Sequence, residues 1–223
     1  MRIRHRILLA FAIATSAGAG LLASTPAALA SPPAARVTIV HGIPGATVTV
    51  YVDGKVLIKH FVFGGIAGPV VLKPGTHSVA IRNYGAKSTA KPIVSENLAM
   101  RAGENASVVA DLNSAGKAQL SFLDNPTSSV AKGFARLDIR HLAAAPAVDV
   151  FAGTVKVGSS LSNGRQLALS IPPGLHTMRL QLAGRSTIVL GPTKYTLATS
   201  TTTILYVFGS AAGKSLTFIR DTY

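Results

Sequence analysis

Four histidines are the side chains of this sequence best suited to catalysis or metal binding. His41 and His141 each end a predicted strand, while His77 and His176 each follow a Pro-Gly turn. Neutral imidazoles bind metals, so His41 and His77 could begin a metal site if their strands lie side by side. Such a site needs more ligands, and the sequence has no cysteine and no local carboxylate cluster. We therefore predict no metal and no cofactor, and we expect structural roles such as hydrogen bonds to turn carbonyls.

The same histidines mark the candidate ligand site. The most distinctive repeated feature is a histidine followed by a loop of variable sequence, residues 42–46 after His41 and residues 142–146 after His141. We take four residues as ligand-site candidates on this basis: His41, His141, His77 and His176.

The carboxylates give little support for catalysis. Only eight exist, and Asp138 and Asp149 could face each other across adjacent strands, although pairing with Arg136 or Arg140 is the simpler expectation. General acid and base chemistry needs two carboxyl groups held together in a cleft. No serine lies in a Gly-x-Ser-x-Gly motif, and the glycine-rich segment 63–68 lacks the Lys-Ser/Thr ending of a phosphate loop. We predict no catalytic residue and no enzyme. The alternative is a small extracytoplasmic hydrolase acting on cell-wall material.

Aromatic side chains are scarce. The chain has no tryptophan, and a flat platform for stacking on sugars could draw only on Tyr51, Phe61, Phe63 and Tyr84 in its first half. We expect most of these rings to pack in the core or against hairpins.

The chain carries the same pattern twice. The segment RVTIVHGIPGATVTVYVDGK at Arg36 corresponds to RLDIRHLAAAPAVDVFAGTV at Arg136, LKPGTHSVAIR to IPPGLHTMRLQ, and SAGKAQLSFLD to AAGKSLTFIRD. Chance similarity would not keep three such signatures in order. We predict two homologous domains, 36–125 and 135–223, joined by a linker at 126–134.

Each copy follows the period of a strand rather than that of a helix. Val48, Val50 and Val52 alternate with other residues and lead into Asp53-Gly54, a strong two-residue hairpin signal. Turn signals recur along each copy, and no long stretch has apolar residues at helical spacing. The predicted fold is all-β, with two tandem immunoglobulin-like β-sandwich domains and almost no helix after a cleaved signal peptide.

The first thirty residues indicate export. Arg2, Arg4 and Arg6 precede an apolar run, and Ala28-Leu29-Ala30 suits signal peptidase. We predict a signal peptide at 1–30 followed by a disordered start at 31–35, with a retained membrane anchor as the alternative. No second apolar run has spanning length, so we expect no transmembrane anchor in the mature chain.

The composition is strongly basic. Of the 22 lysines and arginines, three arginines lie in the predicted signal peptide, so 19 basic side chains oppose 8 acidic ones in the rest of the chain. Such a surface attracts polyanions, although dispersed basic residues also simply keep a protein soluble. The expected partner is an anionic cell-wall polymer or an extracellular protein. Nucleic acid is not expected, and the sequence leaves the oligomeric state open.

Two sets of segments carry a family resemblance. HGIPGATVTVYVDGK and HLAAAPAVDVFAG, followed by PGTHSVAIR and PPGLHTMRL, resemble the bacterial secreted family called domain of unknown function 4397. The first copy departs from that family by placing Thr47–Val50 where an AVDV motif is usual, and the second by placing Ala152-Gly153 at the Asp-Gly turn. The resemblance implies a fold and an extracytoplasmic location.

These observations favour a secreted, non-catalytic binding or structural module of the bacterial cell envelope. An adhesin-like protein-binding module, which would use a free sheet edge, is the other alternative.

Overall fold

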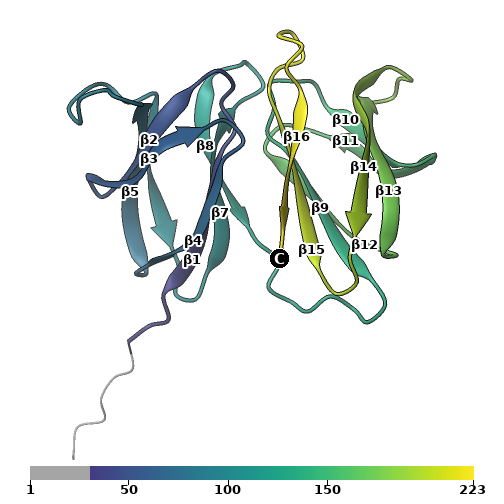
Figure 1. Ribbon diagram of the computed structural model, residues 1–223, viewed down its shortest axis with the longest axis horizontal. Helices are drawn as coiled ribbons and strands as arrows, with labels where there is room; N and C mark the ends of the chain where they lie inside the picture. Colours follow the sequence, from purple (N-terminus) through teal and green to yellow (C-terminus); the bar gives the residue numbers. More distant parts are fainter. Residues whose placement is uncertain (1–30) are drawn as a thin grey trace, which may run out of the picture. The chain divides into compact units, whose positions relative to one another are not determined.

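The computed structural model describes residues 31–223, and the predicted signal peptide at 1–30 lies outside the described residues. Pro32–Tyr223 form one compact unit built from β-strands (Figure 1). Residues 31–223 contain no helix, which confirms the all-β prediction for this range. It follows that none of them forms a helix long and apolar enough to cross a membrane.

The first half of this range folds into two four-stranded sheets, which we call the N-terminal sandwich. Their strand orders are β4-β1-β7-β8 and β3-β2-β5-β6. β1 and β7 are parallel, and the other neighbours are antiparallel. The strands are β1 (Ala35–His41), β2 (Thr47–Val52), β3 (Lys55–Val62), β4 (Ile66–Leu72), β5 (Gly75–Asn83), β6 (Val94–Met100), β7 (Asn105–Leu112) and β8 (Ala118–Asp124).

The second half, the C-terminal sandwich, repeats this arrangement. Its sheet orders are β12-β9-β15-β16 and β11-β10-β13-β14, which are the N-terminal orders moved along by eight strands. The parallel pair recurs as β9 and β15. The strands are β9 (Ala135–His141), β10 (Val148–Ala152), β11 (Val155–Leu161), β12 (Arg165–Ile171), β13 (Gly174–Leu182), β14 (Ile188–Leu197), β15 (Thr202–Phe208) and β16 (Thr217–Thr222).

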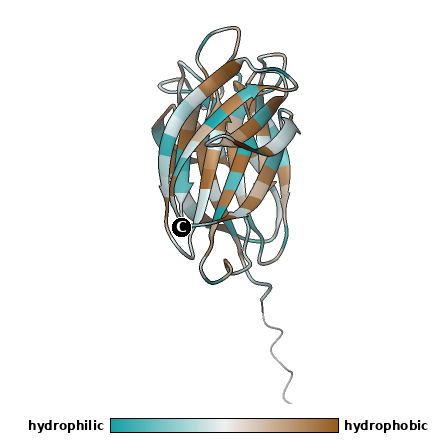
Figure 2. Cartoon of the chain, turned by 90° about the vertical axis from the view of Figure 1, so that its right-hand side faces the viewer, coloured by the Kyte–Doolittle hydropathy of each residue, from teal (hydrophilic) through white to brown (hydrophobic). Residues whose placement is uncertain are grey.

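Alternation of residue type explains why these segments form strands with one face inward. Figure 2 shows hydrophobic and hydrophilic bands alternating along several strands. In β2, Val48 and Val50 are fully buried in the core, so Thr49 lies on the opposite face. β2 ends in the predicted hairpin turn, where Asp53 and Gly54 have φ of 50° and 74°. Two consecutive positive φ angles are what a tight hairpin requires.

Each sandwich has its own hydrophobic core between its two sheets. Val37, Val48 and Val108 are among the buried residues of the N-terminal core. Leu137, Val150 and Leu205 are among those of the C-terminal core. Both sheets of each sandwich therefore bury one face, which supplies most of the stabilisation in a chain without disulfides.

A third apolar cluster joins the two sandwiches, and we call it the junction. It is formed by side chains on the far face of the sheets that contain β1 and β9. Gly42 allows this close packing, because a Cβ there would lie 2.3 Å from the ring of Phe208. The buried residues of the cluster are Val40, Val109, Leu123, Leu142, Ile204, Tyr206 and Phe208.

The first strand begins inside the predicted start segment at 31–35. β1 begins at Ala35, which is fully buried and lies one residue before the predicted first domain. The carbonyl of Pro33 accepts a hydrogen bond of 2.8 Å from the amide of Gly103, so this part of the predicted disordered start contacts the turn before β7. The predicted linker at 126–134 falls between β8 and β9.

Candidate anion-binding site

His41 and His141 fasten the loops that follow them. Both side chains are buried. The Nε2 atom of His41 lies 3.0 Å from the carbonyl oxygen of Ala46, and that of His141 lies 3.1 Å from the carbonyl oxygen of Pro146. Burial lowers the pKa of both imidazoles, which favours the neutral form. The hydrogen bonds to turn carbonyls that the sequence suggested are present, and neither ring is exposed to a ligand.

His77 and His176 fasten the Pro-Gly turns in the same way. Their Nε2 atoms lie 2.8 Å from the carbonyl oxygens of Lys73 and Pro172, respectively. The Nδ1 atom of His77 also lies 2.7 Å from Oδ2 of Asp53. The Lys73 carbonyl, and after it the Asp53 carboxylate, raise the pKa of His77, since both accept hydrogen bonds from the charged ring.

The structure does not bring His41 and His77 together. The loop held by His41 precedes β2, whereas Asp53, the partner of His77, follows the last residue of β2. The two histidines therefore lie at opposite ends of that strand. Across residues 31–223, no three His, Cys, Asp or Glu side chains gather where a metal could bind.

Asp138 and Asp149 do not form a catalytic pair. Asp138 lies on β9 and Asp149 on β10, and these strands belong to different sheets. Asp138 pairs with Arg140 at 2.9 Å, and Asp149 pairs with Lys156 at 2.7 Å. Each carboxylate thus has a basic partner of its own.

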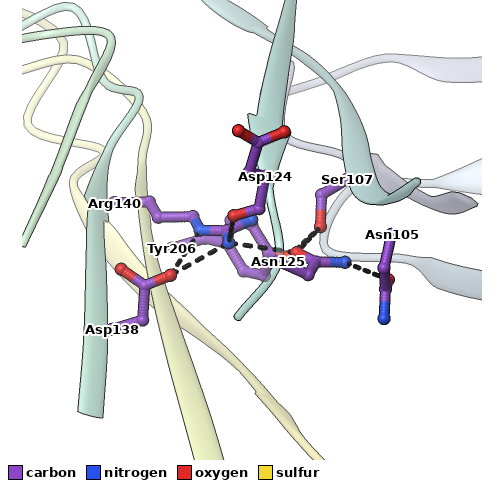
Figure 3. A network of polar contacts seen from close by, with 7 residues as sticks. All are labelled: Asn105, Ser107, Asp124, Asn125, Asp138, Arg140 and Tyr206. Atoms are coloured by element: carbon purple, nitrogen blue, oxygen red, sulfur yellow. Dashed lines mark hydrogen bonds and ion pairs between the residues drawn. The ribbon is translucent and has the colours of Figure 1, made fainter. Parts of the chain in front are cut away.

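Arg140 is the centre of a buried polar network at the junction (Figure 3). Its Nε donates to Asp138 at 3.0 Å, and its Nη2 donates to the carbonyl of Asp124 and to Oδ1 of Asn125, both at 3.0 Å. Burial raises the pKa of Asp138, and the charge of Arg140 opposes that effect. The arginine of the C-terminal sandwich therefore bonds directly to the end of β8 and to the segment after it.

The network extends to a second contact between the sandwiches. Ser107 Oγ lies 2.8 Å from Asn125 Oδ1 and 3.0 Å from the hydroxyl of Tyr206. A cleft of about 370 Å³ lies beside this network, lined in part by Arg36, Asp221 and the buried Asn125. Because the cleft carries one base and one acid, its charge favours no class of ligand. We assign the network to holding the sandwiches together.

A hollow on the outer face of the sheet β3-β2-β5-β6 is different in character. It has a volume of about 340 Å³, and we call it the N-terminal hollow. Strands β2 and β3 and the turn after β5 supply its walls. No acidic side chain lines it. The lining residues are Thr49, Tyr51, Val56, Lys59, Tyr84, Gly85 and Ala86.

Two basic side chains make this hollow electropositive. Lys59 lines it and is exposed. Arg82 lies opposite Thr49 in the strand register, and its guanidinium carbon stands 4.9 Å from the centre of the Tyr51 ring. The Nε of Arg82 donates to the carbonyl of Ala90 at 2.8 Å, which fixes the guanidinium in place. One lining cation, a second cation over a lining ring and no lining acid together favour an anionic group.

Only two of the four aromatic residues considered for a sugar platform lie in this hollow. Tyr51 is 8% exposed beneath Arg82, and Tyr84 is 54% exposed. Phe61 is buried in the N-terminal core. Phe63 packs against the ring of Phe208 at the junction.

Sequence reasoning missed Lys59 and Arg82 as site residues. They are two basic residues among many in the sequence. The alternation of residues along one strand does not show which basic side chains lie on the same face of the sheet, because a β-bulge changes the register between β2 and β3. Aligning the two copies position by position is the signal that could have found them, because the second copy has Gln181 where the first has Arg82, in the same register position.

The family model described as Domain of unknown function (DUF4397) matches residues 35–151, more than half of the chain, and the protein belongs to that family. The match spans the N-terminal sandwich and ends in β10.

Similarity to other proteins is more distant. No curated protein matches the chain. Nine chains of solved structures do, among them the Bacillus anthracis TIE protein, with 14% sequence identity and a TM-score of 0.25. That match covers 81% of this chain and 34% of the TIE chain, so the protein spans about a third of the other's length.

Proposed function

We propose that the protein is a secreted, non-catalytic binding module of the bacterial cell envelope. Its partner is an anionic cell-wall polymer, and the N-terminal hollow is where the polymer binds. The observation that carries this proposal is that Lys59 lines a hollow without any acidic lining residue, while the Arg82 guanidinium stands over the ring of Tyr51, which also lines it. The excess of 11 basic over acidic side chains after the predicted signal peptide adds a long-range attraction for such a partner.

Two further observations support the proposal. Residues 1–30 have the sequence features of a signal peptide, which accounts for export. The C-terminal sandwich repeats the strand order of the family domain, and we interpret it as a second copy of that domain. The second copy adds further basic side chains to the same chain, which extends the attraction for a polyanion.

Retention on isolated bacterial cell-wall fractions tests the function. The purified protein should be retained at low ionic strength and released steeply as salt rises, since exposed charges are screened within about 10 Å at 0.1 M salt. No retention at low salt would overturn the proposed partner. Retention that is unaffected by salt would also contradict the proposed partner, because it would show that apolar contacts rather than charge hold the protein on the wall.

A further inference from the structure

In the C-terminal sandwich, the outer face of the sheet β11-β10-β13-β14 binds a carboxylate of the chain itself. On β10, the carboxylate of Asp149 accepts three hydrogen bonds. The amide of Ser160 donates to Oδ1 at 3.0 Å, the amide of Gly184 donates to Oδ2 at 3.2 Å, and Lys156 Nζ lies 2.7 Å from Oδ2. These bonds, with that from Lys156 the strongest, lower the pKa of Asp149 to about 2. Two backbone amides and one ammonium group therefore form a carboxylate cradle.

The N-terminal sandwich has a threonine where this carboxylate stands. Asp149 lies opposite Gln181 in the β10–β13 register, and Thr49 lies opposite Arg82 in the β2–β5 register. Threonine is shorter and carries no charge. The position that a carboxylate fills in the C-terminal sandwich therefore belongs to the N-terminal hollow, which Thr49 lines.

The backbone of the cradle is nonetheless kept in the N-terminal sandwich. His60 has φ of 51°, like the 52° of Ser160, in a β-bulge at the same place in the register. Gly85 has φ of 79°, like the 69° of Gly184, in the same turn. A non-glycine residue with positive φ is uncommon, so its occurrence in both copies indicates one shared backbone geometry.

The two amides that would donate have no carboxylate partner. Among residues 31–223, no side chain accepts a hydrogen bond from the amide of His60, and neither backbone nor side chain accepts one from Gly85. The matching amides of Ser160 and Gly184 converge on one carboxylate in the C-terminal sandwich, and amides arranged in this way bind anions. The N-terminal hollow thus has a carboxylate cradle whose carboxylate the chain itself does not supply.

The charges around the cradle are rearranged to suit an external anion. Val56 takes the register position of Lys156, opposite Tyr51 as Lys156 is opposite Phe151. Arg82 takes the position of the uncharged Gln181. The base that pairs with Asp149 has no counterpart here. An arginine stands over the aromatic ring in both sandwiches, Arg82 over Tyr51 and Arg179 over Phe151, and Lys59 adds positive charge to the lining of the N-terminal hollow.

We propose that the N-terminal hollow binds the carboxylate of a sugar acid, held where Asp149 holds its own carboxylate in the other sandwich. The inference rests on the proposed function and names the group that the site recognises. A carboxylate fits because the two amides of the cradle bond different oxygens of one planar group. Lys59 and Arg82 then provide charge-assisted contacts.

The remaining space of the hollow suits a sugar ring that bears the carboxylate. The hollow of about 340 Å³ is far larger than a carboxylate and falls in the range of about 300–1,000 Å³ seen for ligand pockets. Tyr84 is 54% exposed at the rim of the hollow. Its ring packs edge-on against that of His60, with 4.8 Å between the ring centroids. An exposed tyrosine offers both a stacking face and a hydroxyl to a sugar ring.

Titration of the ¹⁵N-labelled protein with sodium glucuronate, followed by NMR, tests the site. The amide signals of His60 and Gly85 should shift and saturate, whereas glucose at equal concentration should leave them in place. Thr49→Asp supplies an internal carboxylate and should weaken glucuronate binding by about tenfold or more. Thr127→Asp makes the same charge change at an exposed linker position and should bind as the unaltered protein does.

Further arms of the experiment separate the alternatives. Thr49→Asp combined with Val56→Lys copies the C-terminal pair and should also lose binding, with a dispersed spectrum showing that it is folded. Inorganic phosphate that shifts the same amides as strongly as glucuronate would overturn the carboxylate assignment. N-acetylalanine binding as tightly as glucuronate would overturn the sugar assignment. If wall retention persists while no carboxylate moves the amide signals of His60 or Gly85, the carboxylate site is wrong and only the salt-dependent binding to the wall polymer stands.

Discussion

The two sandwiches share a strand order but differ at the same two outward positions. On its β9 and β10, the C-terminal sandwich has Asp138 and Asp149, each buried and paired with a base. The N-terminal sandwich has Thr38 and Thr49 at the matching places in the register. Core positions keep their apolar character in both copies, so the fold is preserved while these outward positions diverge. The outward polar positions therefore give the two sandwiches different contacts: ion pairs in the C-terminal sandwich and none at the matching threonines of the N-terminal sandwich.

The divergence has opposite consequences on the two faces. At the junction, the acid and its base fix one sandwich to the other through the Arg140 network. On the outer face, the acid of the C-terminal sandwich closes a cradle, and its absence from the N-terminal sandwich leaves a cradle open.

Removing the buried base should have the largest effect. Arg140→Val leaves Asp138 buried without its partner and should lower the free energy of unfolding by about 3–5 kcal/mol. Chemical denaturation followed by circular dichroism measures this loss.

The matched double variant sharpens the comparison. Arg140→Val with Asp138→Thr copies Val40 and Thr38 of the N-terminal sandwich and should recover part of the loss, because no unpaired charge remains. A double variant as unstable as the single one would show that the contacts of Arg140 with Asp124 and Asn125 matter more than its pairing with Asp138.

Asp111 gives the next largest effect and distinguishes the sandwiches at the junction. It is fully buried on β7, where the C-terminal sandwich has Phe208. Burial raises its pKa to about 7, with hydrogen bonds from Ser121 and Gln119 acting against the rise. Between about pH 4 and pH 7 the folded protein therefore binds a proton that the unfolded chain releases. Stability contributed by this group is present at low pH and is lost as pH rises through 7.

Asp111→Asn removes that pH dependence. The variant should be more stable than the unaltered protein at pH 8, by about 1.4 kcal/mol for each unit of pKa shift removed. At pH 4 the two proteins should unfold at nearly the same denaturant concentration. A variant that loses stability equally at both pH values would contradict the account, since it would show that the carboxylate is needed in its charged form.

Asp149→Thr should have a smaller effect on stability and a specific effect on binding. The substitution removes three hydrogen bonds from the C-terminal cradle and should lower the melting temperature by roughly 5 °C. Its contribution is present above pH 4 and is lost as pH falls toward 2, because the folded protein holds the pKa of Asp149 at about 2. Differential scanning calorimetry at pH 7 and pH 2.5 measures both.

Opening this second cradle should also add a binding site. Glucuronate should then shift the amides of Ser160 and Gly184, which are occupied by Asp149 in the unaltered protein. If those two amides stay in place although the variant is folded, backbone geometry alone does not make the cradle.

The smallest expected change in stability concerns the β2–β3 turn, which contains an acidic residue, Asp53, only in the N-terminal sandwich. Asp53 accepts a hydrogen bond from His77, whereas the C-terminal sandwich has Ala152-Gly153 at this turn. Asp53→Asn should lower the pKa of His77 and shift the melting temperature by no more than about 2 °C, because the pair is exposed to solvent. NMR titration of the imidazole signals measures the pKa. A pKa of His77 that does not fall would show that the Lys73 carbonyl alone controls it.

Much of the fold could be predicted from local pattern. Strand alternation, the Asp53-Gly54 turn and the Pro-Gly turns are short-range signals, and they predicted the two sandwiches and the absence of helix in residues 31–223. The hydrogen bonds of the four histidines to turn carbonyls were likewise expected, because each bond spans only four or five residues.

The site could not be predicted in the same way. Lys59, Arg82 and Tyr84 come from separate strands and turns, and a bulge at His60 decides which of them meet. The junction depends on Arg140 and Asn125, which lie on different elements and looked like ordinary polar residues in the sequence. Register across a sheet fixes such meetings, and single-strand periodicity does not contain it.

Wall retention of the Thr49→Asp variant shows whether the N-terminal hollow binds the polymer. The unaltered protein, Thr49→Asp and Thr127→Asp would be applied to the same bacterial cell-wall fraction at one low salt concentration. If the open cradle binds the polymer, Thr49→Asp should lose most of its retention while Thr127→Asp, with the same net charge, keeps it. Equal retention of both variants would contradict this site, because it would show that the overall charge of the protein, and not the hollow, binds it to the wall.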